Sequence, residues 1–266
     1  MGGSGKNPFE PGGSSGVRTG RMSSNDPNMQ NVPTRGPFKK KIRNCFIPAE
    51  GYTWIKCDAD QIEMRGMTHM SQDQAMMAAF NSDGDFFVNM AIQLFNEPEF
   101  QKSDPRRQFV KNGGYAKIYG AGIPKFSKTA GVSEDEGRAF MNLFDSTFSG
   151  VVRWTRELEA LARRRLDVEG EAYVRSPLTN RKLVADAGKL YTLVNYAIQG
   201  MAAEILKIKL VEADNAGLGD FMILPVHDEI DFEVPDDQVG DVLATLNDVF
   251  LGLFTLELAV RVAAYG

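Results

Sequence analysis

The chain has 266 residues, of which 43% are hydrophobic, 24% charged and 10% aromatic. These fractions exclude a disordered, collagen-like or low-complexity protein, and the length allows one large domain or two smaller ones. Two cysteines, Cys45 and Cys57, are too few for a disulfide scaffold and fit a reducing compartment. The first residues hold no apolar signal-peptide core, and the apolar stretch Val249–Val260 is too short to span a bilayer. The composition therefore predicts a cytoplasmic protein with no membrane partner.

The charge is distributed unevenly along the chain. The net charge is −5, but residues 1–43 carry a net charge of +6 and residues 211–266 a net charge of −11. One hypothesis is that the basic arm meets a polyanion and the acidic end meets metal cations. The alternative is that both are ordinary solvated faces.

The N-terminal quarter contains two kinds of irregular chain and then a strand. Residues 1–16 are rich in Gly, Ser and Pro and predict a flexible tail, and residues 17–48 mix turn-formers with basic residues and predict extended, irregular chain. The segment Tyr52–Asp58 is a strand candidate, with Thr53, Ile55 and Cys57 on one face and the other four residues on the opposite face. Asp60 is then expected to cap a helix that runs to about Met70.

The rest of the chain alternates between long helical patterns and short strands. Helices are expected at residues 73–81, 85–95, 105–118, 133–147, 149–168 and 187–213, with a short hairpin at 171–176 and 181–185. Near the end, Phe221–Val226 and Glu229–Val234 predict two antiparallel strands joined by a tight turn at His227–Asp228. A helix at 236–253 and a strand at 257–264 complete an α+β fold: a small antiparallel sheet with a large helical insertion.

Acidic residues gather at two strand ends. Asp58 ends the first strand, and Asp228 and Glu229 sit side by side at the tip of the late hairpin. Carboxylates in such positions are the hard oxygen ligands that suit Mg²⁺. For Asp60 and Glu63 the structural alternative is a capping box, whose spacing they have. With two histidines in the chain and no spaced partner, His227 is not predicted to bind zinc.

A stripe of functional side chains follows one helix. Four residues recur at intervals of four and so share one slowly drifting face: Arg107, Lys111, Tyr115 and Tyr119. Two cations followed by two aromatic rings suit phosphates at one end and a base or sugar at the other; the alternative is an ordinary basic amphipathic helix. Gly113 and Gly114 each cost about 1 kcal/mol relative to Ala in a helix, which predicts either the close approach of a planar group or a helix break.

The combination and order of these features resemble the polymerase region of family A DNA polymerases, that is, bacterial DNA polymerase I and its phage relatives. The segment Thr19–Pro33 is similar to that family's T-G-R-L-S-S-x-x-P-N-L-Q-N-I-P, and Asp58–Arg65 to its motif A, D-Y-S-Q-I-E-L-R. Arg107–Gly120 has the spacing of motif B, Asn195–Gly200 is similar to a segment that touches primer–template, and Val226–Glu229 resembles motif C. The resemblance covers residues 17–266.

The resemblance implies a set of chemical roles. Asp58 and Asp228 would hold two Mg²⁺ ions with support from Glu229, and Lys111 would protonate the leaving group. Nucleotide binding would involve Gln61, Arg107, Lys111 and Tyr115. Glu63 together with Tyr119 would select deoxynucleotides. Contacts to primer or template DNA would come from Arg21, Asn195, Gln199 and His227.

The sequence also departs from the family pattern. Tyr115 stands where most bacterial members have Phe, which predicts ready acceptance of dideoxynucleotides. Ala59 and Asp60 replace the usual Tyr and Ser, and Phe87 stands where many relatives have His.

The resemblance divides the chain into a tail (1–16), a first palm segment (17–65), fingers (66–188) and a second palm segment (189–266). The family's thumb and exonuclease domains are expected to be absent. The predicted function is thus a DNA polymerase core of a bacterial or phage-infected cytoplasm, without proofreading and with low processivity. The alternative is a non-catalytic nucleotide- or DNA-binding fragment that needs a partner chain to supply the thumb. An RNA polymerase relative is disfavoured by Glu63.

Overall fold

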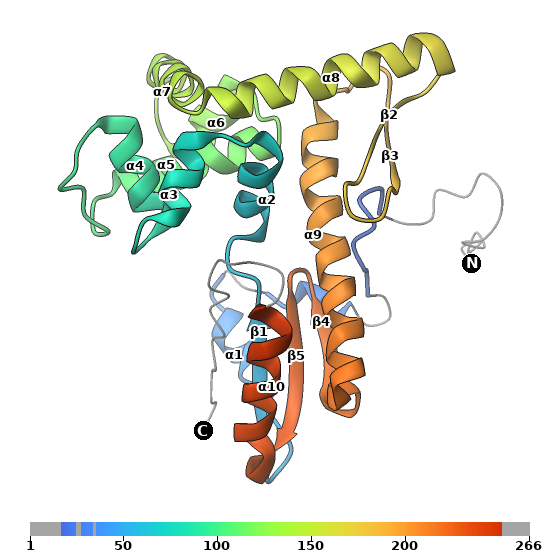
Figure 1. Cartoon of the computed structure of the whole chain (residues 1–266). Coiled ribbons are helices and arrows are strands. Elements are labelled where there is room, and N and C mark those ends of the chain that lie inside the picture. Colours follow the sequence, from blue (N-terminus) through green and yellow to red (C-terminus); the bar gives the residue numbers. More distant parts are fainter. Residues whose placement is uncertain (1–16, 25–27, 34–35, 252–266) are drawn as a thin grey trace, which may run out of the picture. The chain divides into compact units, whose positions relative to one another are not determined.

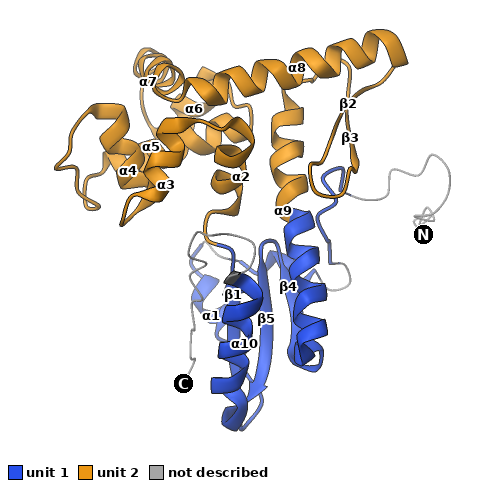
Figure 2. Ribbon diagram, in the orientation of Figure 1, with its two compact units in different colours: residues 1–59, 203–252, 259–266 blue, residues 60–202, 253–258 orange. Residues whose placement is uncertain are grey.

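The computed structural model describes residues 17–24, 28–33 and 36–251, and this part of the chain is mostly helical with two small antiparallel sheets (Figure 1). The chain forms two compact units, of which the first holds the described residues up to Ala59 and from Ala203, and the second holds Asp60–Ala202 (Figure 2). The predicted fingers segment (66–188) begins 6 residues later than this second unit and ends 14 residues earlier, and the palm and fingers boundaries stay a prediction. The predicted tail and the strand at 257–264 lie outside the described residues.

The first unit is built on a three-stranded antiparallel sheet in the order β1-β5-β4. The strands β1 (Tyr52–Asp58) and β5 (Glu229–Pro235) lie where the alternating patterns predict them, and β4 (Met222–Val226) lies where the apolar run predicts it. One face of the sheet is buried core, formed by Ile55, Cys57, Ile230, Phe232 and Val234. The other face carries a polar row, since Lys56 lies opposite Asp231 and Asp58 opposite Glu229.

Helices complete the first unit. The helix α10 (Val239–Leu251), which follows a 3₁₀ turn at Asp236–Gln238, contacts β5 and buries Val242 and Leu246. The short helix α1 (Lys39–Arg43) corrects the expectation of wholly irregular chain before β1. Its residues KKKIR are fair helix formers and contain none of the Gly and Pro that flank them. The long helix α9 (Thr192–Ala213) belongs to the second unit up to Ala202 and to the first unit from Ala203. It starts five residues later than predicted, because 187–191 form turns.

The second unit is helical, with one added hairpin. The predicted helices are confirmed as α2 (Ile62–Ser71), α3 (Gln74–Asn81), α4 (Phe86–Phe95), α5 (Arg106–Ile118), α7 (Glu134–Thr147) and α8 (Ser149–Glu169), and the hairpin as β2 (Ala172–Arg175) and β3 (Lys182–Ala185). A further helix, α6 (Ile123–Ala130), was not predicted. It is only eight residues long, with Pro124 in its first turn and a left-handed Gly131 ending it, so it shows too few periods to read from sequence.

Three helices of the second unit begin with a side-chain cap, which is a carboxylate for α3 and α4 and the hydroxyl of Ser133 for α7. Asp73 and Asp85 accept the backbone N–H groups of Met76 and Val88 at the starts of α3 and α4. The prediction that Asp60 caps α2 is wrong. The chain passes through a left-handed Gln61 (φ 53°) that takes the cap position, so no side chain caps α2 and the expected capping box does not form.

The two glycines of α5 are explained by packing within the second unit. A Cβ at Gly113 would lie 2.2 Å from Cε1 of Phe140 on α7, and one at Gly114 would lie 2.8 Å from Cε of Met64 on α2. The helix continues through both glycines, so the predicted break is wrong. The planar group that approaches is the chain's own Phe140 ring.

Candidate functional site

The carboxylates of the first unit are placed by the backbone of the sheet. Asp58 is the last residue of β1, and Asp228 lies in the two-residue turn between β4 and β5, where His227 adopts a left-handed conformation (φ 56°). Beyond the Asp58–Glu229 pair, the N–H of Ala59 donates to the carbonyl of Asp228 at 3.2 Å. The predicted metal ligands Asp58 and Asp228 are therefore neighbours at one end of the sheet, and both are half-buried.

This donor set fits Mg²⁺. The ion commonly takes one or two carboxylates from the protein and completes its shell with waters and substrate phosphates. Among the residues that the structure describes, no group of three or more His, Cys, Asp or Glu side chains is arranged to hold a metal. Asp58 and Asp228 would thus form a site that needs further oxygens from a ligand.

Glu229 is held by a lysine that the sequence analysis did not select. Lys56 Nζ donates to Glu229 Oε1 at 2.6 Å and to Asp231 Oδ1 at 3.1 Å. Burial lowers the pKa of Lys56, but the two carboxylates outweigh burial and raise it. Burial and the adjacent Glu229 raise the pKa of Asp231 to about 7, although Lys56 opposes the shift. This arrangement supports Glu229 as a neighbour of the metal site rather than a ligand.

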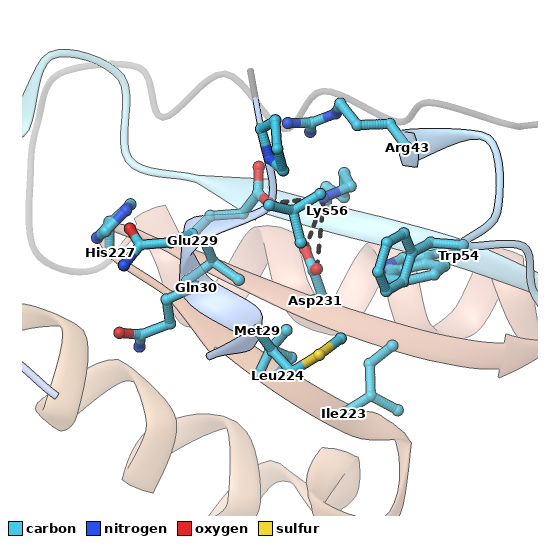
Figure 3. Close-up of a pocket in the computed structure, with 15 residues that line it drawn as sticks. Met29, Gln30, Arg43, Trp54, Lys56, Ile223, Leu224, His227, Glu229 and Asp231 are labelled. Atoms are coloured by element: carbon cyan, nitrogen blue, oxygen red, sulfur yellow. Dashed lines mark hydrogen bonds and ion pairs between the residues drawn. The ribbon is translucent and has the colours of Figure 1, made fainter. Parts of the chain in front are cut away.

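A cavity of about 670 Å³ opens beside these groups in the first unit (Figure 3). Its apolar lining includes Met29, Val32 and Trp54, and its polar lining includes Lys56 and Asp231. Gln30 Nε2 donates to the carbonyl of Pro225 at 2.9 Å, which ties the segment similar to the family's P-N-L-Q-N-I-P to β4. The volume lies in the range of small-molecule sites.

The structure places His227 on the wall of this cavity and Arg21, half-buried, elsewhere in the first unit. Trp54, Lys56 and Asp231 were missed by the sequence analysis. The signal for them was available, because they alternate with core residues on the same strands as Asp58 and Glu229, and so share their face.

In the second unit, the stripe of α5 is confirmed as one helix face. Arg107 contacts Asp85 with two hydrogen bonds, from Nε to Oδ1 at 2.8 Å and from Nη2 to Oδ2 at 2.5 Å. The guanidinium of Arg107 and the ammonium of Lys111 lie 5.6 Å and 5.4 Å from the centre of the Phe87 ring. One aromatic ring thus lies beneath both cations, and Tyr115 packs against the same ring at 6.3 Å.

A buried glutamate connects three of the predicted residues. Tyr119 Oη donates to Glu63 Oε2 at 2.9 Å, and Gln199 Nε2 lies 3.5 Å from Glu63 Oε1. The side chain of Glu63 is buried, while Tyr119 is 45% exposed and stacks near Tyr115, with ring centres 6.4 Å apart. The structure therefore brings motif A, motif B and the α9 segment together around one carboxylate.

Two further predicted residues hold unsatisfied polar atoms. Gln61 Oε1 and Asn195 Nδ2 are buried with no hydrogen-bond partner among the described residues. Gln61 also has the left-handed backbone already noted, and its Nε2 donates to Asp60 at 3.1 Å. Buried polar groups are normally paired, and backbone strain gathers at functional sites, so both features favour a ligand-binding role.

Comparison with known proteins agrees with these motifs. The model of DNA polymerase family A matches residues 13–265. The chain belongs to this family. It is 31% identical over 253 residues to DNA polymerase I of Pseudomonas aeruginosa, covering 92% of this chain and 28% of that protein. It is 30% identical over 250 residues to the thermostable DNA polymerase I of Thermus aquaticus, covering 92% of this chain and 30% of the relative.

A solved structure has the same fold. The POL domain of Pol1 from M. smegmatis, in complex with DNA primer-template and dNTP, superposes with a TM-score of 0.78 at 28% identity, covering 93% of this chain and 45% of that one. The family A polymerase chain described here spans less than a third of the length of the two curated relatives. None of its described helices combines the length and hydropathy needed to cross a membrane.

Proposed function

We propose that this chain is the catalytic core of a DNA-templated DNA polymerase, adding deoxynucleotides to a primer 3′-hydroxyl. The observation that carries the proposal is the placement of Asp58 and Asp228 side by side by the β1–β5 ladder. In the family A polymerase chain, residues 17–65 and 189–266 would be the palm and 66–188 the fingers. Its place of action would be the cytoplasm of a bacterium or of a phage-infected host.

Asp58 and Asp228 would hold two Mg²⁺ ions. When bound, such ions activate the attacking hydroxyl and neutralise the triphosphate and the leaving pyrophosphate. Glu229 would orient this end of the sheet while Lys56 holds its carboxylate, which keeps the negative charge of Glu229 compensated. The protein's task in such a transfer is mostly positioning and charge stabilisation.

The face of α5 would bind the nucleotide. Arg107 and Lys111 would hold the triphosphate, Lys111 would donate a proton to the leaving pyrophosphate, and Tyr115 would stack on the base or sugar. Glu63, held by Tyr119, would fill the space of a ribose 2′-hydroxyl and select deoxynucleotides. The unpaired Oε1 of Gln61 would accept a hydrogen bond from the bound nucleotide.

Primer and template DNA would meet four polar side chains: Arg21, Asn195, Gln199 and His227. The unpaired amide of Asn195 is a hydrogen-bond donor available to a base or sugar. The matched residues carry polymerase motifs, so the activity that we propose for them is nucleotide addition.

The test is extension of a short primer–template at low salt with Mg²⁺, comparing the wild type with Asp228→Ala and with Asp220→Ala, an exposed acidic residue of the same unit. We expect extension by the wild type and by Asp220→Ala, and a loss of at least about 1000-fold for Asp228→Ala. Equal rates for Asp228→Ala and the wild type would contradict the proposal.

A second candidate function is the binding of nucleotide or primer–template without turnover by these residues alone. In that case the wild type binds labelled primer–template or nucleotide but extends no primer at any concentration of enzyme.

A further inference from the structure

The guanidinium of Arg107 has a fixed carboxylate partner in the second unit. Asp85 accepts from Nε and Nη2 of Arg107 in a two-point pair that uses one edge of the guanidinium. Arginine carries five N–H donors in a planar fork, so this pairing leaves the Nη1 edge to face another acceptor. Neither residue is fully exposed, since the side chains of Arg107 and Asp85 are 23% and 17% exposed.

The carboxylate is itself held in place by a helix. Asp85 is the N-cap of α4, and its Oδ1 accepts the backbone N–H of Val88 at 3.1 Å. Lys102 Nζ lies 3.8 Å from Oδ2. Burial raises the pKa of the Asp85 carboxyl, but the hydrogen bonds from Arg107 and Val88 outweigh burial and lower it, so the group is ionised at neutral pH. A capped helix end thus fixes where the carboxylate points.

The ring of Phe87 adds a second constraint on the same arginine. Phe87 is buried in α4, two residues after Asp85, and lies under both Arg107 and Lys111. The first turn of α4 therefore contacts Arg107 in two ways, by a charge pair at the edge of the guanidinium and by a ring against its face. Both contacts limit the rotamers that a long, flexible side chain can adopt.

We propose that Asp85 is a positioning residue for nucleotide binding, which orients Arg107 so that its free edge meets the triphosphate. The inference rests on the proposed function, because it takes Arg107 as a phosphate ligand. Asp85 itself would not touch the nucleotide. It would lower the cost of binding by ordering the guanidinium before the nucleotide arrives.

The neighbouring arginine supplies a matched control. Arg106 is paired with Asp104 and Glu97 on the surface, and Asp104 also accepts the backbone N–H of Arg106 at 2.8 Å at the start of α5. This pair has the same chemistry as Asp85–Arg107, a helix-end carboxylate with a two-point arginine contact. It involves an arginine to which no nucleotide role is assigned.

The experiment compares Asp85→Asn with Asp104→Asn. Asparagine is as good an N-cap as aspartate, so the cap on Val88 is kept. The amide nitrogen then replaces Oδ2, the acceptor of Arg107 Nη2, and removes the negative charge, so the two-point pair is lost. We expect the KM for dNTP to rise about tenfold in Asp85→Asn with kcat changed less than about twofold, since the loss is one of pre-organised binding. Asp104→Asn is expected to keep the wild-type KM, and Asp85→Glu to recover part of it.

Equilibrium binding of a fluorescent dATP to the same proteins gives a readout that does not need turnover. An Asp85→Asn protein that melts like the wild type but has an unchanged or lower KM and Kd for nucleotide would overturn the inference. So would a fall in kcat at constant KM. If the wild type neither extends primers nor binds nucleotide, the proposed function itself fails. If the wild type is active and Asp85→Asn has the same KM and Kd for nucleotide, only the role of Asp85 is overturned.

Discussion

The two units hold their functional side chains by different means. In the first unit, Asp58 and Asp228 are brought together by main-chain hydrogen bonds of an antiparallel ladder. In the second unit, Arg107, Tyr119 and Glu63 are held by contacts between side chains, namely the Asp85 pair and the Tyr119–Glu63 hydrogen bond. The first arrangement depends on strand register, and the second depends on how helices far apart in sequence pack.

This difference determines what each site tolerates. A ladder survives most side-chain changes, because its hydrogen bonds belong to the backbone. A site built from side-chain pairs moves when a packed helix moves, and close-packed interiors transmit such shifts. We therefore expect small packing changes in the second unit to alter nucleotide binding, and side-chain changes on the sheet to alter charge without moving the strands.

The largest expected effect is on stability and follows from the contact of α5 with α7. Gly113→Ala places a Cβ 2.2 Å from the Phe140 ring, so the two helices must separate or Phe140 must leave its rotamer. Overpacking of this kind costs about 1–3 kcal/mol, against a gain of less than about 1 kcal/mol from helix propensity. Urea unfolding is expected to show a lower midpoint, together with a raised KM for dNTP because α5 carries Arg107 and Lys111.

Gly240→Ala in α10 is the matched control for Gly113→Ala. A Cβ at Gly240 would meet nothing within 4 Å, so this change should stabilise the chain slightly through helix propensity. Equal midpoints for the two variants would mean that the α5–α7 contact is not tight.

The next effect concerns the choice of sugar on the face of α5. The hydroxyl of Tyr115 is expected to supply the hydrogen bond that a missing 3′-hydroxyl cannot make, so Tyr115→Phe should lower the use of dideoxynucleotides relative to normal ones by about tenfold. The measurement is the ratio of kcat/KM for a dideoxynucleotide and its deoxynucleotide. Tyr173→Phe on the β2 strand should leave the ratio unchanged, and an unchanged ratio in Tyr115→Phe would refute this role.

The same contrast explains how much the sequence could predict. Period-two alternation located β1 and β5, and an apolar run located β4. The juxtaposition of Asp58 and Asp228 follows, because pairing of alternating strands leaves few registers that bury Ile55 and Phe232 together. Period-four spacing located the stripe of α5 for the same local reason. Within a helix or a strand, the spacing of residues in the sequence largely determines the face on which each side chain lies.

Contacts between elements were not predictable in this way. The pairing of Asp85 with Arg107 joins residues 22 apart, and that of Lys56 with Glu229 joins residues 173 apart. Asp60 has the spacing of a helix cap, yet tertiary context puts Gln61 in a left-handed conformation and moves the cap. The short α6 and the role of Gly113 likewise depend on neighbours that no local window contains.

The smallest expected effect on activity comes from a test of whether charge on the sheet can change without moving the strands. The carboxyl of Asp231 has an unfolded-state pKa near 3.8 and a folded-state pKa of about 7, raised by burial and by Glu229. Between these values the folded chain binds more protons than the unfolded chain, so the free energy of unfolding falls as pH rises from about 4 to about 7. Other groups that face Asp231 are Lys56 across the ladder and Glu229 on its own strand.

Asp231→Asn removes this titration, so its free energy of unfolding should change less over that range than that of the wild type. The expected difference amounts to a stability change of about 1 to 3 kcal/mol between pH 4 and pH 7, because each unit of pKa shift corresponds to about 1.4 kcal/mol. Urea unfolding at four pH values measures it, with exposed Asp220→Asn as a control that keeps the wild-type slope. Because the ladder is made of backbone hydrogen bonds, Asp231→Asn should keep Asp58 and Asp228 adjacent and retain primer extension. An Asp231→Asn protein that loses extension while remaining folded would show that the metal ligands are positioned by the polar row of the sheet and not by the backbone alone.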